Sequence, residues 1–243
     1  MRISFVGDSF CADEKGWPGI VAKSLNAEIA QLGVPGHHIY SQFKKLLLDI
    51  NSIDYIVICV TEPNRIYSDF DHGINSAWAA EDKYVGSKEI IKEGVELGKI
   101  HDAARKYYEY LHDWEYHKFM NVTNIEHISG LLHYLNKKVI WFPCFRNSLE
   151  YPDFLIKFYG RRQFIPESGP CADTPLYDIS RSEGLEEKFF ISGDPRDNHF
   201  SDGNNKILAN LILDIIKKDD FTGHPIKMLD HFKVSWGDGP HNA

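Results

Sequence analysis

Groups that could act together in acyl transfer lie near opposite ends of this chain. Ser9 stands in the tripeptide Gly7-Asp8-Ser9, and His199 stands in Asp197-Asn198-His199, just before a strongly amphipathic segment. A serine hydroxyl attacks a carbonyl poorly until an imidazole removes its proton, and a carboxylate holds that imidazole in the correct tautomer. The sequence therefore offers a nucleophile, a base and an acid, provided that the fold brings the two ends together.

The position of Ser9 after an apolar run favours a site at a sheet edge. Residues 3–6 form a short β-rich run, and Gly7, Asp8 and Ser9 are residue types that favour turns and caps. A strand that ends in such a turn presents Ser9 at the carboxyl edge of a sheet, where open α/β folds bind ligands. A surface turn is the simpler interpretation of this tripeptide alone, and His199 is what favours the catalytic one.

Four stretches of the sequence, taken in chain order, resemble the conserved blocks of the SGNH/GDSL hydrolase superfamily. The resemblance rests first on Gly7-Asp8-Ser9-Phe10 and Asp197-Asn198-His199. Gly33-Val34-Pro35-Gly36 is similar to the family's oxyanion-hole glycine block, and Thr61-Glu62-Pro63-Asn64-Arg65 stands where the family usually has Gly-x-Asn-Asp. The resemblance implies a flavodoxin-like α/β fold and ester hydrolysis through Ser9 and His199.

The oxyanion formed in ester hydrolysis needs hydrogen-bond donors aimed at the developing charge. The backbone N–H groups of Ser9 and Gly36 are our candidates, and the resemblance adds the side chain of Asn64. Pro35-Gly36 is also a turn signal in its own right. Arg65 replaces the expected Asp of the family block, and it is interpreted either as a partner for an acidic substrate group or as a surface residue.

The acid that partners His199 has two candidates, because Arg196 occupies the position of the family's usual aspartate. Asp197 lies two residues before His199, and Asp194 lies five before it. Pro195 favours an extended direction for Asp194 and carries it away from the histidine. We therefore predict Asp197 as the partner. In the alternative, Asp197 only caps the turn and a backbone carbonyl orients His199.

Composition places the chain among ordinary globular proteins. It has 243 residues, 43% of them hydrophobic and 26% charged, and a formal net charge of -8. We expect a single α/β domain spanning residues 1–243, with an insertion and a C-terminal tail added to its core. An acidic surface without a long basic run repels phosphate backbones, so we expect no nucleic-acid partner. No apolar run reaches membrane-spanning length, so we expect no membrane partner either.

Cysteine and histidine spacing gives no support for a metal or a cofactor. The cysteines at positions 11, 59, 144 and 171 form no Cys-x-x-Cys pair, and a reduced compartment fits them best. His37 and His38 are adjacent and point in different directions, whereas His112 and His117 are five apart and do not share a helix face. A signal peptide would remove Ser9 on cleavage, so we expect a cytoplasmic location, with export by another route as the alternative.

Alternating strand and helix patterns predict a three-layer fold with a parallel sheet of about five strands. Strands are predicted at Ile3–Val6, Ala27–Leu32, Tyr55–Val60, Lys138–Pro143 and Phe189–Ser192. Helices are predicted at Trp17–Leu25, Gln42–Asp49, Asn124–Leu135 and Asn204–Lys217. In this topology the turns at Ser9, Gly36, Asn64 and His199 would gather at one edge.

Two segments depart from this alternation. Residues 66–120 predict a helical insertion, with a long helix from about 87 to 119, that serves either as a lid over the site or as a peripheral helical pair. Residues 145–187 are predicted as loop. The tail from about residue 221 either wraps the domain or stays loose.

The leading hypothesis is a serine esterase that hydrolyses a small ester or an O-acyl group, such as O-acetyl, on a carbohydrate. The alternative is a non-catalytic carbohydrate-binding module on the same fold, motivated by the altered block at residues 61–65. A flavin or nucleotide binder that uses the Ser9 turn is a third hypothesis. The lack of a Gly-rich phosphate loop argues against its nucleotide form.

Overall fold

A sheet of parallel strands forms the centre of the molecule. The computed structural model describes residues 1–65, 97–180, 200 and 202–232. Within these ranges the sheet has four strands in the order β2-β1-β3-β4, all parallel. They are β1 (Arg2–Val6), β2 (Glu28–Gln31), β3 (Tyr55–Val60) and β4 (Lys138–Pro143). The α/β fold class is confirmed, with one strand fewer than expected, because the predicted strand at 189–192 lies outside the described residues.

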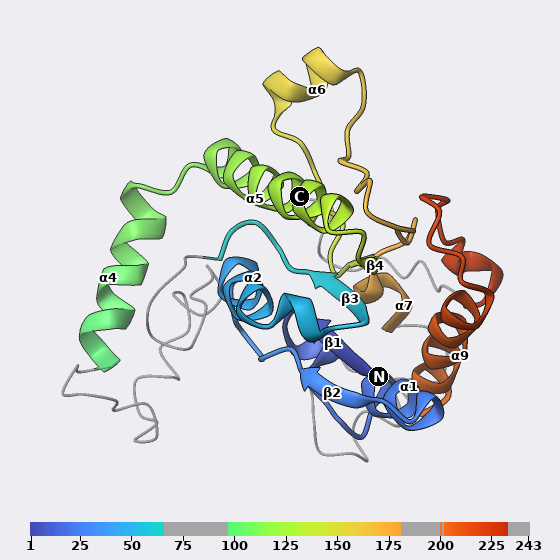
Figure 1. The fold of residues 1–243 in the computed structure, drawn as a ribbon. Helices are drawn as coiled ribbons and strands as arrows, with labels where there is room; N and C mark the ends of the chain where they lie inside the picture. The colour runs from blue at the N-terminus through green and yellow to red at the C-terminus, as the bar shows by residue number, and fades with distance from the viewer. Residues whose placement is uncertain (66–96, 181–199, 201, 233–243) are drawn as a thin grey trace.

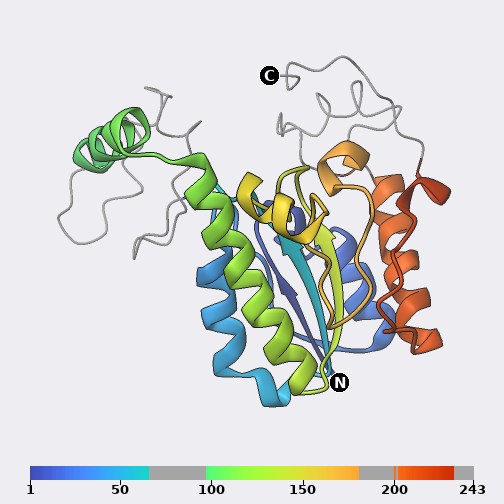
Figure 2. The same ribbon diagram turned by 90° about the horizontal axis from the view of Figure 1, so that it is seen from above.

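Helices cover both faces of the sheet and make the three layers that the sequence predicts (Figures 1 and 2). Helices α1 (Trp17–Leu25) and α9 (Asp202–Lys218) lie on one face. Helices α2 (Ile39–Leu48) and α5 (Trp114–Tyr134) lie on the other. This arrangement is consistent with a flavodoxin-like α/β/α fold.

The core has two halves because successive strand residues point to opposite faces of the sheet. On the α1/α9 side, buried strand residues pack with helix residues such as Trp17 and Leu208. The strand residues are Ile3, Phe5, Val57, Cys59, Ile140 and Phe142. On the α2/α5 side they pack with helix residues such as Phe43 and Ile125. The strand residues there are Val6, Ile56, Ile58, Val60, Val139 and Trp141.

Two helices differ from their predicted bounds for identifiable reasons. Helix α2 begins at Ile39, before the predicted Gln42, because the imidazole Nδ1 of His38 caps it by accepting from the Tyr40 N–H at 3.0 Å. Helix α5 begins ten residues before the predicted Asn124, with Asp113 as its N-cap. The expected end of the insertion and the expected core helix are therefore one continuous helix.

The described part of the insertion is α4 (Leu97–Tyr110) and the start of α5. The segment predicted as loop contains two short helices, α6 (Asp153–Tyr159) and α7 (Leu176–Ser180). That prediction was wrong at these positions, because helices of seven and five residues are too short to show a helical period.

Short 3-10 turns complete the chain: η1 (Ser9–Cys11), η2 (Ile50–Ser52) and η5 (Met228–Asp230). The first part of the tail wraps the domain. Ile226 forms a parallel bridge with Ala172, and Met228 and Phe232 are buried in the α1/α9 half of the core.

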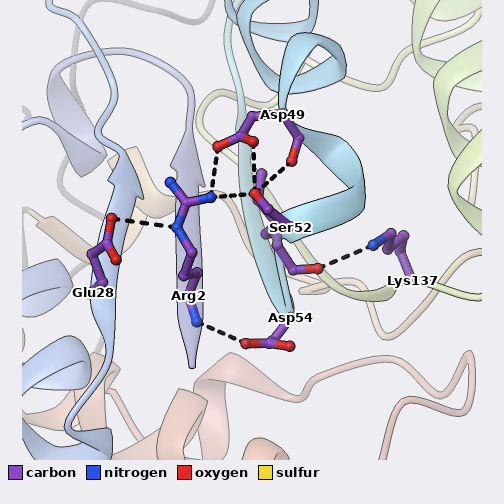
Figure 3. A network of polar contacts seen from close by, with 7 residues as sticks. Arg2, Glu28, Asp49, Ser52, Asp54 and Lys137 are labelled. Carbon is purple, nitrogen blue, oxygen red and sulfur yellow. Dashed lines mark hydrogen bonds and ion pairs between the residues drawn. The ribbon is translucent and has the colours of Figure 1, made fainter.

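A polar network ties the strands together at their amino ends, opposite the expected site (Figure 3). The Arg2 guanidinium donates to Glu28 at 3.3 Å, to Asp49 at 2.7 Å and to the Ser52 hydroxyl. The Arg2 backbone N–H donates to Asp54 at 2.7 Å. These contacts join β1, β2 and the start of β3 at that edge.

No helix in the described ranges is both long enough and apolar enough to cross a bilayer.

Candidate active site

The turn that carries Ser9 is shaped by glycine and by an aspartate cap. After β1 the chain passes Gly7, where a Cβ atom would lie 2.5 Å from the Cys59 carbonyl oxygen, so only glycine fits without displacement. Asp8 Oδ1 then accepts from the Phe10 N–H at 3.2 Å and caps the 3-10 turn that begins at Ser9. Ser9 is half-buried at the carboxyl end of β1, as the sequence predicts.

The glycine block after β2 is hydrogen-bonded to the Ser9 turn. The Val34 N–H donates to the Gly7 carbonyl, and the Gly33 N–H donates to the Cys11 carbonyl, both at 3.1 Å. Gly33 also has to be glycine, because a Cβ there would lie 2.5 Å from the Asp8 carbonyl oxygen.

Gly36 occupies the left-handed position of a tight turn. Pro35 and Gly36 are its central residues, Gly36 has φ +78°, and the His37 N–H donates to the Val34 carbonyl at 3.1 Å. These are the features of a type II turn. The donor that closes this turn is the His37 N–H and not the Gly36 N–H.

Arg65 joins the loop after β3 to both preceding segments. Its Nη2 donates to Asp8 Oδ2 at 2.8 Å, and its Nη1 donates to the His37 carbonyl at 3.2 Å. Its Nε lies 2.9 Å from Glu62 Oε1. The Arg65 side chain is 6% exposed and that of Asp8 is fully buried. The interpretation of Arg65 as a surface residue is wrong, because the guanidinium is buried. Its role toward an acidic substrate group stays a prediction.

Burial and charge act against each other in this network. Burial raises the pKa of Asp8, and the positive charge of Arg65 only partly opposes it. Burial lowers the pKa of Arg65, but Glu62 and Asp8 outweigh that effect and the net shift is upward, so Arg65 stays protonated. Burial, helped by the Arg65 charge, lowers the pKa of His38 to about 4, so this imidazole is neutral near pH 7.

Asn64 is held by the helical insertion. The Tyr108 hydroxyl of α4 donates to the Asn64 carbonyl oxygen. Asn64 is half-buried in the same loop as Arg65, at the carboxyl end of β3. The described part of the insertion therefore contacts the candidate site directly.

The start of α9 reaches the Ser9 turn from the other end of the chain. The Phe200 ring lies against Phe10, with centroids 6.1 Å apart. Asn205 donates from Nδ2 to the Phe200 carbonyl at 3.0 Å and accepts from the Trp17 N–H at 2.8 Å. Ser9 and Phe200 line one hollow of about 50 Å³, whose other lining residues include Asp13, Trp17 and Asn205.

Three of the predicted site residues lie outside the described residues. They are His199, Asp197 and the alternative acid Asp194. The structure brings together the segments of Ser9, Gly36 and Asn64, and it places Phe200, which directly follows His199 in the sequence, beside the Ser9 turn.

No family model, no curated protein and no solved structure matches this chain.

His112 and His117 do not share a helix face, as their spacing predicts, but their side chains meet across a turn. Their rings are stacked with centroids 4.7 Å apart, because His112 lies in the turn between α4 and α5 and folds back onto the helix. His117 Nε2 is also 2.6 Å from the Tyr107 hydroxyl. Across the described ranges, no three His, Cys, Asp or Glu side chains are grouped so as to hold a metal ion.

Three thiols in or near the Ser9 turn stay protonated. Cys11, Cys59 and Cys144 are buried and unpaired, and burial raises the pKa of each, that of Cys144 to about 12. The Cys144 thiol lies 3.9 Å from Asp8 Oδ1 as a weak donor. The thiol form is inert as a nucleophile, so these cysteines act as small core residues.

Proposed function

We propose that this chain is a serine esterase of the SGNH/GDSL type. The observation that carries the proposal is the meeting of Phe10 and Phe200 beside a hollow that Ser9 lines. Ser9 is the nucleophile and His199, directly before Phe200, is the base. Asp197 is the proposed partner of His199.

In the proposed reaction the Ser9 hydroxyl attacks the ester carbonyl and His199 accepts its proton. The backbone N–H groups of Ser9 and Gly36 and the side chain of Asn64 stabilise the oxyanion. Collapse of the tetrahedral intermediate breaks the ester bond, and the alcohol leaves with the proton from His199. Water, deprotonated by His199, then hydrolyses the acyl-Ser9 ester and restores both groups.

The substrate we propose is a small ester or an O-acyl group on a carbohydrate, with O-acetyl as the first choice. The hollow beside Ser9 measures about 50 Å³, which is room for only a few water-sized groups. We propose that a short acyl group enters this hollow, which is only partly enclosed. The described insertion adds aromatic side chains near Asn64, which suit a sugar ring.

The proposal is tested by hydrolysis of p-nitrophenyl acetate, butyrate and octanoate by purified protein. The acetate should be hydrolysed fastest, and a fluorophosphonate should label Ser9. Hydrolysis by a Ser9→Ala variant at the wild-type rate would refute the nucleophile.

The second candidate is a non-catalytic carbohydrate-binding protein on the same fold. It is favoured by the altered block at residues 61–65, in which Arg65 forms ion pairs with Asp8 and Glu62. It predicts no hydrolysis and no labelling, together with a binding isotherm for acetylated oligosaccharide in calorimetry.

A further inference from the structure

We infer that Arg65 is a positioning residue for the proposed reaction, holding the three loops of Ser9, Gly36 and Asn64 in one arrangement. The inference rests on the proposed function, since the loops it concerns are the ones that carry the proposed nucleophile and oxyanion donors.

The geometry of Arg65 links one side chain to three segments. It donates to Asp8 of the Ser9 turn at 2.8 Å and to the His37 carbonyl, directly after Gly36, at 3.2 Å. Glu62 of its own loop lies 2.9 Å from its Nε. Arginine suits this task because its planar guanidinium directs five donors in fixed directions, whereas lysine offers one compact charge.

The link from Arg65 to Ser9 passes through Asp8. One carboxylate oxygen of Asp8 accepts from Arg65, and the other accepts from the Phe10 N–H, which caps the turn that begins at Ser9. Loss of the guanidinium therefore loosens the cap and the turn together. The effect on the reaction is indirect, because Arg65 is only 6% exposed and has little surface to offer a substrate.

The groups that face Asp8 determine the pKa of its carboxyl. Arg65 and Glu62 face it from the loop after β3, and the thiols of Cys11, Cys59 and Cys144 face it from its own turn, β3 and the end of β4. Of these described groups, Arg65 is the one cation. Without it, burial and the charge of Glu62 would keep Asp8 protonated to higher pH.

The experiment compares wild type with Arg65→Met, Arg65→Lys, Asp8→Asn and the Asp8→Asn/Arg65→Met double variant. Arg105→Met is the matched control, because Arg105 forms an exposed ion pair with Asp102 and its replacement removes one arginine without unpairing a buried carboxylate. The quantities measured are kcat and KM for p-nitrophenyl acetate across pH and the rate of fluorophosphonate labelling of Ser9.

We expect kcat of Arg65→Met to fall about 10²-fold or more, because small misplacement of reacting groups has costs of this order. KM should stay within about twofold, since a positioning residue does not touch the substrate. Arg65→Lys should recover part of the loss. The acid limb of the kcat profile should move to higher pH in Arg65→Met and not in the double variant, which has no Asp8 carboxyl to titrate.

Three results would overturn the inference. A rise in KM with unchanged kcat would make Arg65 a substrate-binding residue. Equal activity of Arg65→Met and Arg105→Met would leave Arg65 with no role. The third result is a loss of kcat in Arg65→Met that is equal at every pH, adds to the loss in Asp8→Asn and is not reduced in Arg65→Lys. That result would mean general destabilisation of the fold.

Failure of the proposed function gives a different pattern. Wild-type protein would then neither hydrolyse esters nor be labelled at Ser9. The loop arrangement is still tested in that case by ¹³C NMR titration of the Asp8 carboxyl, whose pKa should rise in Arg65→Met. An unchanged Asp8 pKa would refute the link from Arg65 to Asp8.

Discussion

The aromatic rings of Phe10 and Phe200 lie edge to face with their centroids 6.1 Å apart. Phe10 directly follows Ser9 in the sequence, and Phe200 directly follows His199. The contact therefore joins two segments from opposite ends of the chain. The contact depends on α1 and α9 lying side by side on the same face of the sheet (Figure 1).

Replacement of Ser9 by alanine should abolish ester hydrolysis and leave the fold intact. Loss of a triad nucleophile lowers kcat by about 10⁴–10⁶ in well-studied serine hydrolases. The measurement is kcat with p-nitrophenyl acetate, together with circular dichroism. Ser24→Ala is the control, because Ser24 is exposed on α1 and its replacement should leave kcat unchanged.

Asp197→Asn should lower kcat strongly, and Asp194→Asn should lower it little. In a triad the Asp-to-Asn change costs about 10⁴ because it favours the wrong imidazole tautomer. Both variants are assayed side by side. A large loss only in the second would exchange the two roles, and small losses in both would indicate that a backbone carbonyl orients His199.

Tyr108→Phe should lower kcat without a comparable change in stability. The Tyr108 hydroxyl donates to the Asn64 carbonyl oxygen, and a looser Asn64 would be a poorer oxyanion donor. Tyr110→Phe is the matched control, because Tyr110 is 72% exposed on the same helix. Equal kcat in the two variants would count against Asn64 as an oxyanion donor.

Arg65→Met should lower the free energy of unfolding by about 3–5 kcal/mol at neutral pH, since it leaves a buried carboxylate unpaired. The deficit relative to wild type should depend on pH. Removal of Arg65 raises the pKa of the Asp8 carboxyl further above its value in the unfolded chain. Between those two pKa values the native variant binds one proton more than the unfolded chain does. The stability of the variant therefore falls as pH rises through this interval.

The deficit should therefore be smallest well below about pH 4, the ordinary pKa of an aspartate, where Asp8 is protonated in every state. Urea unfolding of wild type and Arg65→Met across pH measures it. The Asp8→Asn/Arg65→Met double variant should be more stable than Arg65→Met at neutral pH, and a deficit that shrinks with rising pH would contradict the sign.

Gly33→Ala and Gly130→Ala should change stability in opposite directions. A Cβ at Gly33 would lie 2.5 Å from the Asp8 carbonyl oxygen and from Cys11 Sγ, so the variant should be destabilised. A Cβ at Gly130 meets nothing within 4 Å on α5. Alanine there should stabilise by about 0.5–1 kcal/mol through helix propensity. Thermal unfolding midpoints of the two variants test the contrast.

The sequence by itself determined the four described strands of the sheet and the edge where the turns at Ser9, Gly36 and Asn64 gather. The apolar runs of β1, β3 and β4 are long enough to be recognised as buried strands. The wide apolar stripe of α9 identified that helix to within two residues at its start. Local pattern was sufficient at these places, because each element buries a face that its own residues define.

Only the tertiary structure decided which polar groups meet. Asp8 and Arg65 are 57 positions apart, and their pairing depends on the parallel pairing of β1 with β3, which no local pattern encodes. The His38 cap on α2 and the stacking of His112 on His117 follow from turn geometry. Spacing rules apply within a regular element and fail across a turn, so these contacts had to be seen in three dimensions.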